Sequence, residues 1–209
     1  FPALAAAPRV EHTPLACVGP ASHARISAHI PGNPAGVRVY FHVAGATCGE
    51  YYVDMRRSAS DPTLYTAFLP ILAAGAQVLT YEIRTTDGVG KEIAGMPISV
   101  ALKNDCPAPA LTADEVRAAE NITLGLTNAA QSQAPCKFRC DGVKNVMTVN
   151  HELKQNEACR LLLAGLEKPW YQTAEGMALS AGGVVAAGFG VNAAIQNHRQ
   201  NRAPSPARP

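Results

Sequence analysis

The chain has 209 residues, of which 47% are hydrophobic and 16% are charged, and its formal net charge is +2. This length suits one domain of ordinary size with additional elements. The small net charge and the scattered Lys and Arg residues exclude the strongly basic surface of a nucleic-acid-binding protein, so we expect no nucleic-acid partner.

The cysteines and the first residues both indicate export. Six cysteines, an even number, predict an oxidised domain with disulfides: Cys17, Cys48, Cys106, Cys136, Cys140 and Cys159. Residues 1–9 contain the pattern Ala3-Leu4-Ala5, which is typical of the end of a signal peptide or the start of a mature exported chain. A bridge between Cys17 and Cys106 would join the ends of the first predicted domain, but six cysteines permit fifteen pairings.

Residues 10–106 contain short stretches that alternate between apolar and polar residues and are separated by turn residues, as in β-strands. In VRVYFHV (37–43) the odd positions are apolar and predict a buried face, whereas the even positions predict a solvent face. Asp87-Gly88 predicts a hairpin turn. The predicted strands are Ala24–Ile30, Val37–Val43, Tyr51–Arg56, Leu64–Leu69, Val78–Thr86 and Ile98–Lys103. Short strands at this spacing indicate a mainly β fold, a β-sandwich.

The succession VRVYFHVAG, YYVDMRR, LYTAFLP, VLTYEIRTTDGVGKE and PISVAL resembles the fibronectin type III or immunoglobulin-like β-sandwich module of a bacterial exported, membrane-anchored protein. The resemblance covers about half of the chain. It implies adhesion, docking or spacing as the function of the module, and it does not imply catalysis.

Residues 107–170 predict a small α+β linker region that contains disulfides. Thr112 and Glu115 have the spacing of a capping box at the start of a short helix, and the stretch ITLGLT after it alternates like a strand. The stretch NHELKQNEACRLLLAGL (150–166) predicts a helix. Its residues Leu153, Leu161 and Leu162 are available to pack on the sandwich or on the membrane surface.

Residue patterns for chemistry are weak. Cys136, Cys140, His151 and Cys159 offer zinc ligands, but their spacing does not match a common zinc finger, and disulfides are the simpler interpretation. The charges of YYVDMRR, from Asp54 to Arg57, suggest a polar site or, more simply, a solvated strand face. The sequence has no phosphate loop and no nucleophile elbow. We therefore expect no enzyme, no catalytic residue, no metal and no cofactor.

Residues 171–198 predict one transmembrane helix. The stretch Gly176–Asn197 has no formal charge over 22 residues. As a helix it would be about 33 Å long, which matches a hydrocarbon core of about 30 Å. Trp170 and Tyr171 precede it as aromatic interface anchors. Small residues recur at every fourth position and predict a stripe that packs against another helix: Ala178, Gly182, Ala186, Gly190 and Ala194.

The residues after the span predict its orientation. They include Arg199, Arg202 and Arg208 and no acidic residue, which favours a cytoplasmic C-terminus. The Pro-rich residues 199–209 predict a disordered cytoplasmic tail. The expected location is the bacterial inner membrane, with the N-terminal domain in the periplasm.

These features predict a non-catalytic accessory subunit of a bacterial membrane protein complex, such as a respiratory, photosynthetic or secretion assembly. Its expected partners are membrane lipid and other membrane protein subunits, which the transmembrane helix would contact. Two alternatives stay open: a self-associating surface protein for adhesion or binding, and a soluble periplasmic binding module whose Gly/Ala-rich helix is buried in its own fold.

Overall fold

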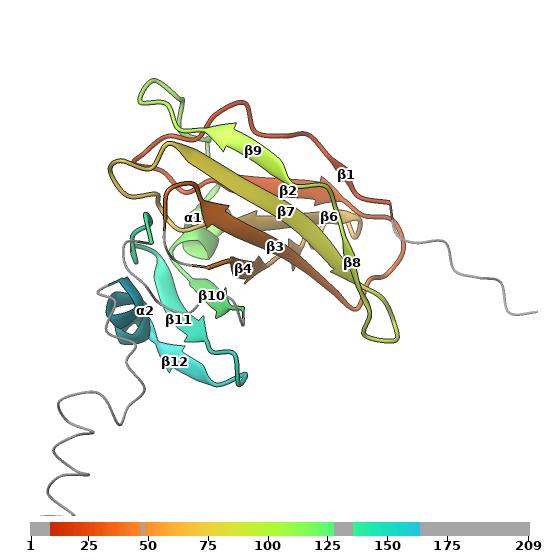
Figure 1. Ribbon diagram of the computed structural model, residues 1–209. Helices are drawn as coiled ribbons and strands as arrows, with labels where there is room; N and C mark the ends of the chain where they lie inside the picture. The colour runs from red at the N-terminus through yellow and green to blue at the C-terminus, as the bar shows by residue number, and fades with distance from the viewer. Residues whose placement is uncertain (1–8, 47–48, 128–135, 164–209) are drawn as a thin grey trace, which may run out of the picture. The chain divides into compact units, whose positions relative to one another are not determined.

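Two β-sheets and two short helices make up the described part of the chain (Figure 1). The structure is a computed structural model that describes residues 9–46, 49–127 and 136–163. All of these residues belong to the unit Phe1–Leu166. The strands are β1 (Glu11–His12), β2 (Arg25–His29), β3 (Gly36–Val43), β4 (Tyr51–Asp54), β5 (Arg56–Arg57), β6 (Leu64–Phe68), β7 (Val78–Thr86), β8 (Glu92–Ala94), β9 (Ile98–Ala101), β10 (Ile122–Leu126), β11 (Val143–Met147) and β12 (Leu153–Gln155), and the helices are α1 (Ala113–Ala119) and α2 (Asn156–Leu163).

The two sheets have different sizes. The small sheet has the order β1-β2-β6-β5, and the long sheet has the order β12-β11-β10-β4-β3-β7-β8, with β9 also paired to β7. Neighbouring strands are antiparallel except β10 and β11, which are parallel. The fold is therefore mainly β and sandwich-like, as the alternating pattern predicts.

The sandwich does not end at residue 106. Strand β10 pairs with β4, and β11 and β12 extend the long sheet further. Within the region predicted as a linker (107–170), residues 122–155 therefore contribute three strands to the long sheet of the predicted sandwich (10–106). The physical reason is that β4 leaves a free backbone edge, which the alternating stretch ITLGLT satisfies with ladder hydrogen bonds.

The core lies between the two sheets. In β3, the apolar positions 37, 39, 41 and 43 are all buried, as their period-two alternation predicts. The rings of Phe41 and Tyr51 lie 5.9 Å apart, and the ring of Phe138 lies 5.0 Å from that of Tyr51 in an edge-on arrangement. Phe138 thereby packs the chain before β11 against the core of the sandwich.

The local start signals of the helices and turns agree with the structure. Thr112 caps α1, and both hydrogen bonds of the predicted capping box with Glu115 are present. In the predicted Asp87-Gly88 turn, the Asp87 side chain accepts hydrogen bonds from the backbone N–H groups of Val89 and Lys91. The predicted helix over 150–166 is shorter than expected. Residues 153–155 pair with β11 as strand β12, and α2 begins at Asn156.

The predicted transmembrane helix (171–198) and tail (199–209) lie outside the described residues. In the part of the chain that the structure describes, no helix has the length and hydrophobicity needed to span a bilayer.

Candidate functional site

The outer face of the long sheet carries two arginines and two tyrosines on its central strands. Arg38 and Tyr40 lie on β3, Tyr52 on β4 and Arg84 on β7. The strand register places Tyr40 opposite Tyr52 and Arg38 opposite Arg84. The alternation that buries the odd positions of β3 turns these four side chains away from the core. Together with their carboxylate partners Glu50, Asp54, Glu82 and Glu92, we call them the arginine–tyrosine face.

Arg38 connects three strands of this face. Its guanidinium carbon lies 4.4 Å from the ring centroid of Tyr52. Its Nε donates a 2.8 Å hydrogen bond to Asp54, and its Nη1 lies 3.7 Å from Glu92 on β8. A cation over an aromatic face contributes about 1 kcal/mol, so stacking and ion pairing hold the guanidinium in one position.

Arg84 repeats this arrangement beside the first. Its guanidinium carbon lies 3.9 Å from the ring centroid of Tyr40. Its Nε donates a 2.9 Å hydrogen bond to Glu82, and its Nη2 donates a 3.1 Å bond to Glu50. Each arginine is thus stacked on one tyrosine and shared between two carboxylates.

Contacts between the tyrosines join the two arrangements. The rings of Tyr40 and Tyr52 lie 5.5 Å apart, and the Tyr40 hydroxyl donates a 2.6 Å hydrogen bond to Glu92. Tyr40 is only 5% exposed and Tyr52 only 7% exposed, although both lie on an outer face. The ring of Tyr52 lies over Gly125 of β10, where an added Cβ would be 2.1 Å from the ring carbon Cζ. The face is therefore rigid, and it depends on a glycine.

The carboxylates offset the repulsion between the two arginines, which are cross-strand neighbours. Like charges placed directly opposite each other on a sheet repel. Burial opposes the charge of Arg38, but hydrogen bonds with Asp54 and Tyr40 outweigh it and raise the pKa of Arg38. The hydrogen bond with Glu82 raises the pKa of Arg84. Four carboxylates against two guanidiniums leave the arginine–tyrosine face with a net charge of −2.

The tyrosines stay neutral at physiological pH. Burial raises the pKa of Tyr40, and its hydrogen bond to Glu92 adds to this effect. Burial likewise raises the pKa of Tyr52. The face therefore presents fixed charges, and the covered tyrosine rings hold the two guanidiniums in place, which suits recognition of another molecule.

Apart from the arginine–tyrosine face, a hollow of about 940 Å³ lies between α1 and the outer face of the small sheet. Arg25 spans it with a 3.0 Å ion pair to Glu115, and the Arg56 side chain donates a 3.4 Å bond to the carbonyl of Asn121. The hydrogen bond from the backbone N–H of Thr112 and the contact with Arg25 lower the pKa of Glu115. These groups fix α1 onto the sandwich.

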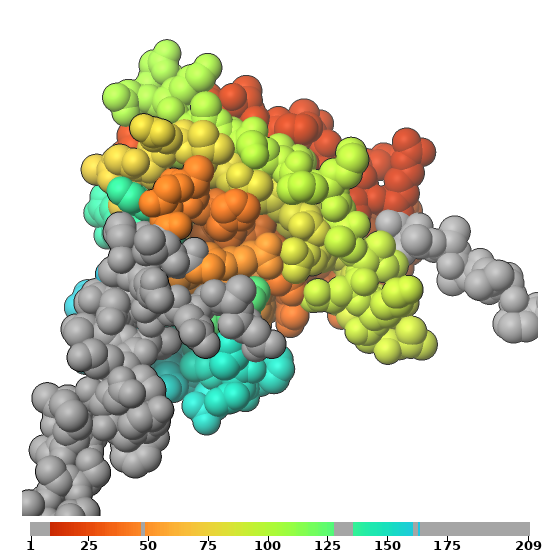
Figure 2. Space-filling view, viewed as in Figure 1, coloured from red at the N-terminus to blue at the C-terminus, as the bar shows by residue number. Residues whose placement is uncertain are grey.

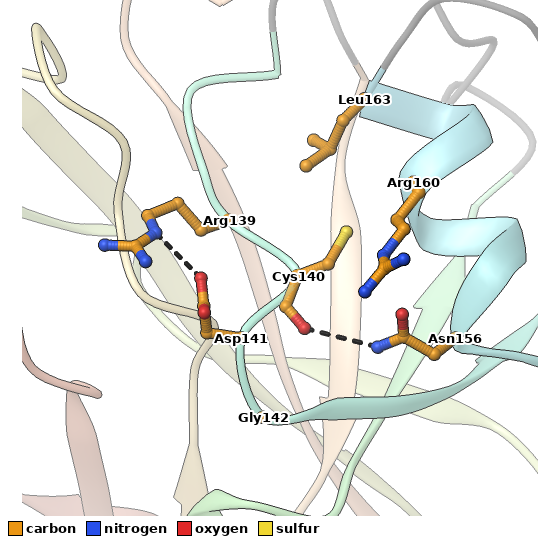
Figure 3. Close-up of a pocket in the computed structure, with 7 residues that line it drawn as sticks. All are labelled: Arg139, Cys140, Asp141, Gly142, Asn156, Arg160 and Leu163. Atoms are coloured by element: carbon orange, nitrogen blue, oxygen red, sulfur yellow. Dashed lines mark hydrogen bonds and ion pairs between the residues drawn. The ribbon is translucent and has the colours of Figure 1, made fainter.

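Another hollow lies beside α2 (Figure 3). Arg139 and Asp141 form a 2.7 Å ion pair at one side of it, and Arg160 and Leu163 of α2 line the opposite side. The amide of Asn156 donates hydrogen bonds to the carbonyls of Cys140 and Val143.

Disulfides hold both ends of the described unit. Cys17 is bonded to Cys106 across 89 positions, the pairing that the sequence suggested, and Cys140 is bonded to Cys159 across 19 positions. Cys136 is disulfide-bonded as well, whereas Cys48 lies outside the described residues. The zinc interpretation of Cys136, Cys140, His151 and Cys159 is therefore wrong, because bonded sulfurs are not available as thiolate ligands. Among the described residues, no group of three or more His, Cys, Asp or Glu is placed to hold a metal.

The other predicted site residues fall in different places. The packing stripe (Ala178, Gly182, Ala186, Gly190 and Ala194) and the anchors Trp170 and Tyr171 lie outside the described residues. The charges of YYVDMRR do not form one site. Asp54 belongs to the arginine–tyrosine face, whereas Arg56 and Arg57 lie on β5 of the small sheet. The sequence pattern did not predict the arginine–tyrosine face, although the even positions of VRVYFHV (37–43) predict an outward-facing side of that strand.

Comparisons with known proteins bear on the fold of the chain. No protein-family model matches the chain, and no curated protein sequence matches it. Among solved structures, the chain is similar to CopC from Methylosinus trichosporium OB3b, with 16% sequence identity and a TM-score of 0.32. The match covers 45% of this chain and 93% of that chain.

Proposed function

We propose that this chain is a non-catalytic accessory subunit of a bacterial membrane protein complex, with its β-sandwich in the periplasm and residues 171–198 as its membrane anchor. In this proposal the arginine–tyrosine face docks a partner protein that presents a basic patch. The predicted small-residue stripe packs against a membrane helix of the same complex.

The observation that carries the proposal is the fixed arrangement of Arg and Tyr side chains on a sheet face. Arg and Tyr are enriched among the residues that contribute most to protein–protein binding. Their side chains are already held by stacking and ion pairs, so little conformational entropy is lost when a partner binds. The net charge of −2 favours a partner with excess Lys and Arg, because complementary charges speed association and select the orientation.

Two further features support the proposal, one for the location and one for the role. The disulfides of the described residues are typical of proteins that fold in an oxidising compartment. The resemblance of the predicted strands to fibronectin type III and immunoglobulin-like modules implies docking or spacing rather than catalysis.

A charge-reversal pair tests the docking face. Asp54→Lys reverses a carboxylate that pairs with Arg38, and Asp114→Lys reverses a carboxylate that pairs with Arg117 on α1. Both side chains are well exposed, at 63% and 86%. In mild-detergent pull-downs with mass spectrometry, Asp54→Lys should lower partner recovery about tenfold or more, because a like charge at an interface costs several kcal/mol. Equal recovery with both variants contradicts the docking face.

The anchor needs a separate test. Enlarging Gly182 and Gly190 to Leu should release the protein from its complex without unfolding the sandwich, because bulky side chains keep helices apart. Normal co-purification of this double variant contradicts the packing role of the stripe. Carbonate extraction of membranes tests the anchor itself, since a soluble periplasmic protein would be released.

A further inference from the structure

We infer that the end of the long sheet formed by the β11–β12 hairpin and α2, residues 143–163, rests on the lipid surface. We call these residues the hairpin–α2 end. This inference rests on the proposed membrane anchor and adds to it the side of the sandwich that faces the bilayer.

Only a short length of chain joins this end to the predicted span. Helix α2 ends at Leu163, and the predicted span begins at residue 171. The seven intervening residues reach about 25 Å when fully extended. Strands β11 and β12 and helix α2 lie together at one end of the long sheet (Figure 1). The tether therefore holds this end, rather than the β8–β9 edge, close to the bilayer.

The hairpin exposes apolar side chains. Val149 in its turn is 44% exposed, and Leu153 at the start of β12 is 59% exposed. Among the described strands β12 pairs only with β11, so its outer side is an open edge of the described sheet. The hairpin lies at the margin of the described surface in Figure 2. Apolar side chains beside an open edge gain free energy when they enter the headgroup region.

The hairpin–α2 end also carries a small positive charge. Residues 143–163 contain three Lys and Arg residues and two Glu residues, a net charge of +1 with His neutral. Lys144 is exposed on β11, and the Lys154 side chain on β12 is 54% exposed. Arg160 of α2 is exposed and has no ion pair with a described residue. Basic side chains beside exposed apolar ones match an anionic lipid surface.

The arrangement also separates the two proposed contacts by charge. The arginine–tyrosine face, at the centre of the long sheet, has a net charge of −2. The hairpin–α2 end has the opposite sign. An anionic bilayer would attract the positive end and repel the negative face, which leaves that face available for a protein partner.

A depth-quenching experiment tests the inference on the full chain. The protein is reconstituted into vesicles of phosphatidylethanolamine and phosphatidylglycerol that carry a nitroxide quencher on the headgroup. An environment-sensitive fluorophore is attached at Leu153→Cys or, as a control, at Val89→Cys. Val89 is 89% exposed in the turn before β8, at the opposite edge of the long sheet. Lipid quenching should be strong at position 153 and weak at position 89.

A separate double substitution tests the electrostatic part of the contact. In the Leu153→Cys background, Lys144→Gln with Lys154→Gln should lower the ratio of docked to undocked protein about 30-fold, because each lysine near an anionic surface contributes about 1 kcal/mol. Replacing the anionic phosphatidylglycerol by phosphatidylcholine should also lower the ratio of docked to undocked protein.

The outcomes separate this inference from the proposed function. Protein that resists carbonate extraction but shows equal quenching at positions 153 and 89 overturns the hairpin–α2 contact and leaves the anchor intact. Protein that is extracted by carbonate overturns the anchor, and the tether argument fails with it. Quenching at 153 that does not respond to the lysine variants overturns the electrostatic part of the contact.

Discussion

The close contact between the Tyr52 ring and Gly125 gives a specific prediction for the arginine–tyrosine face. Gly125 pairs with Tyr52 across β10 and β4, and a Cβ at Gly125 would lie 2.1 to 2.3 Å from three ring carbons of Tyr52. Gly125→Ala must therefore push the ring away. Because Arg38 stacks on that ring, the substitution also removes one side of the Arg38 site.

The magnitude follows from three effects. Replacing Gly by Ala inside a strand ordinarily stabilises by about 0.5–1 kcal/mol. Forcing a side chain out of a packed position costs about 1–3 kcal/mol, and loss of the Arg38–Tyr52 stack costs about 1 kcal/mol. Gly125→Ala should therefore lower the free energy of unfolding by about 2 kcal/mol, which reverses the usual sign of a Gly→Ala change in a strand.

Urea unfolding followed by near-ultraviolet circular dichroism of the tyrosines provides the assay. Gly88→Ala is the control, because Gly88 has open space around its missing Cβ. In a Tyr52→Val background the ring is absent, so Gly125→Ala should become neutral or stabilising. If Gly125→Ala lowers the free energy of unfolding as much in that background as in the native protein, the Tyr52 ring is not the cause. The packing of the Tyr52 ring on Gly125 is then refuted as the basis of the face.

Three other perturbations follow from single features. Thr85 is fully buried and its hydroxyl has no hydrogen-bond partner among the described residues, so Thr85→Val should stabilise by about 1 kcal/mol in urea unfolding; destabilisation contradicts this. Replacing both Cys17 and Cys106 by Ser should cost about 4.5 kcal/mol in the same assay, because the bridge spans 89 positions; a loss below about 1 kcal/mol argues against it. Burial raises the pKa of Tyr40 and Tyr52, so the unfolded chain loses these phenolic protons at a lower pH than the folded protein. The free energy of unfolding should therefore be fully present below about pH 10 and fall above it. An unchanged free energy of unfolding above about pH 10, where tyrosinate absorbance shows ionisation, refutes the burial of these two hydroxyls.

The local pattern of the sequence predicts most of the sandwich. Period-two alternation locates β3 and β7 within a residue of their observed bounds, and the Thr112–Glu115 spacing locates the start of α1. These elements are determined by neighbours in the chain, which the sequence displays directly.

Long-range pairing accounts for what the sequence does not reveal. Strands β10 and β4 are separated by about 70 residues, and nothing local in ITLGLT shows which edge it will join. The arginine–tyrosine face has the same origin, because all its members except Glu50 come from four strands and meet only through the strand registers. Leu153 was expected in a helix, and its exposed position in β12 is likewise set by the partner strand β11.

The bond between Cys17 and Cys106 has a consequence for how the protein responds to a proteolytic cut. Every strand from β2 to β9 lies within the loop that this bond closes. A protease that cuts at the exposed turn around Val89 therefore produces two fragments that remain covalently attached and still paired along β7. Such a nicked molecule migrates as one species on a non-reducing gel, and only a reductant separates the pieces.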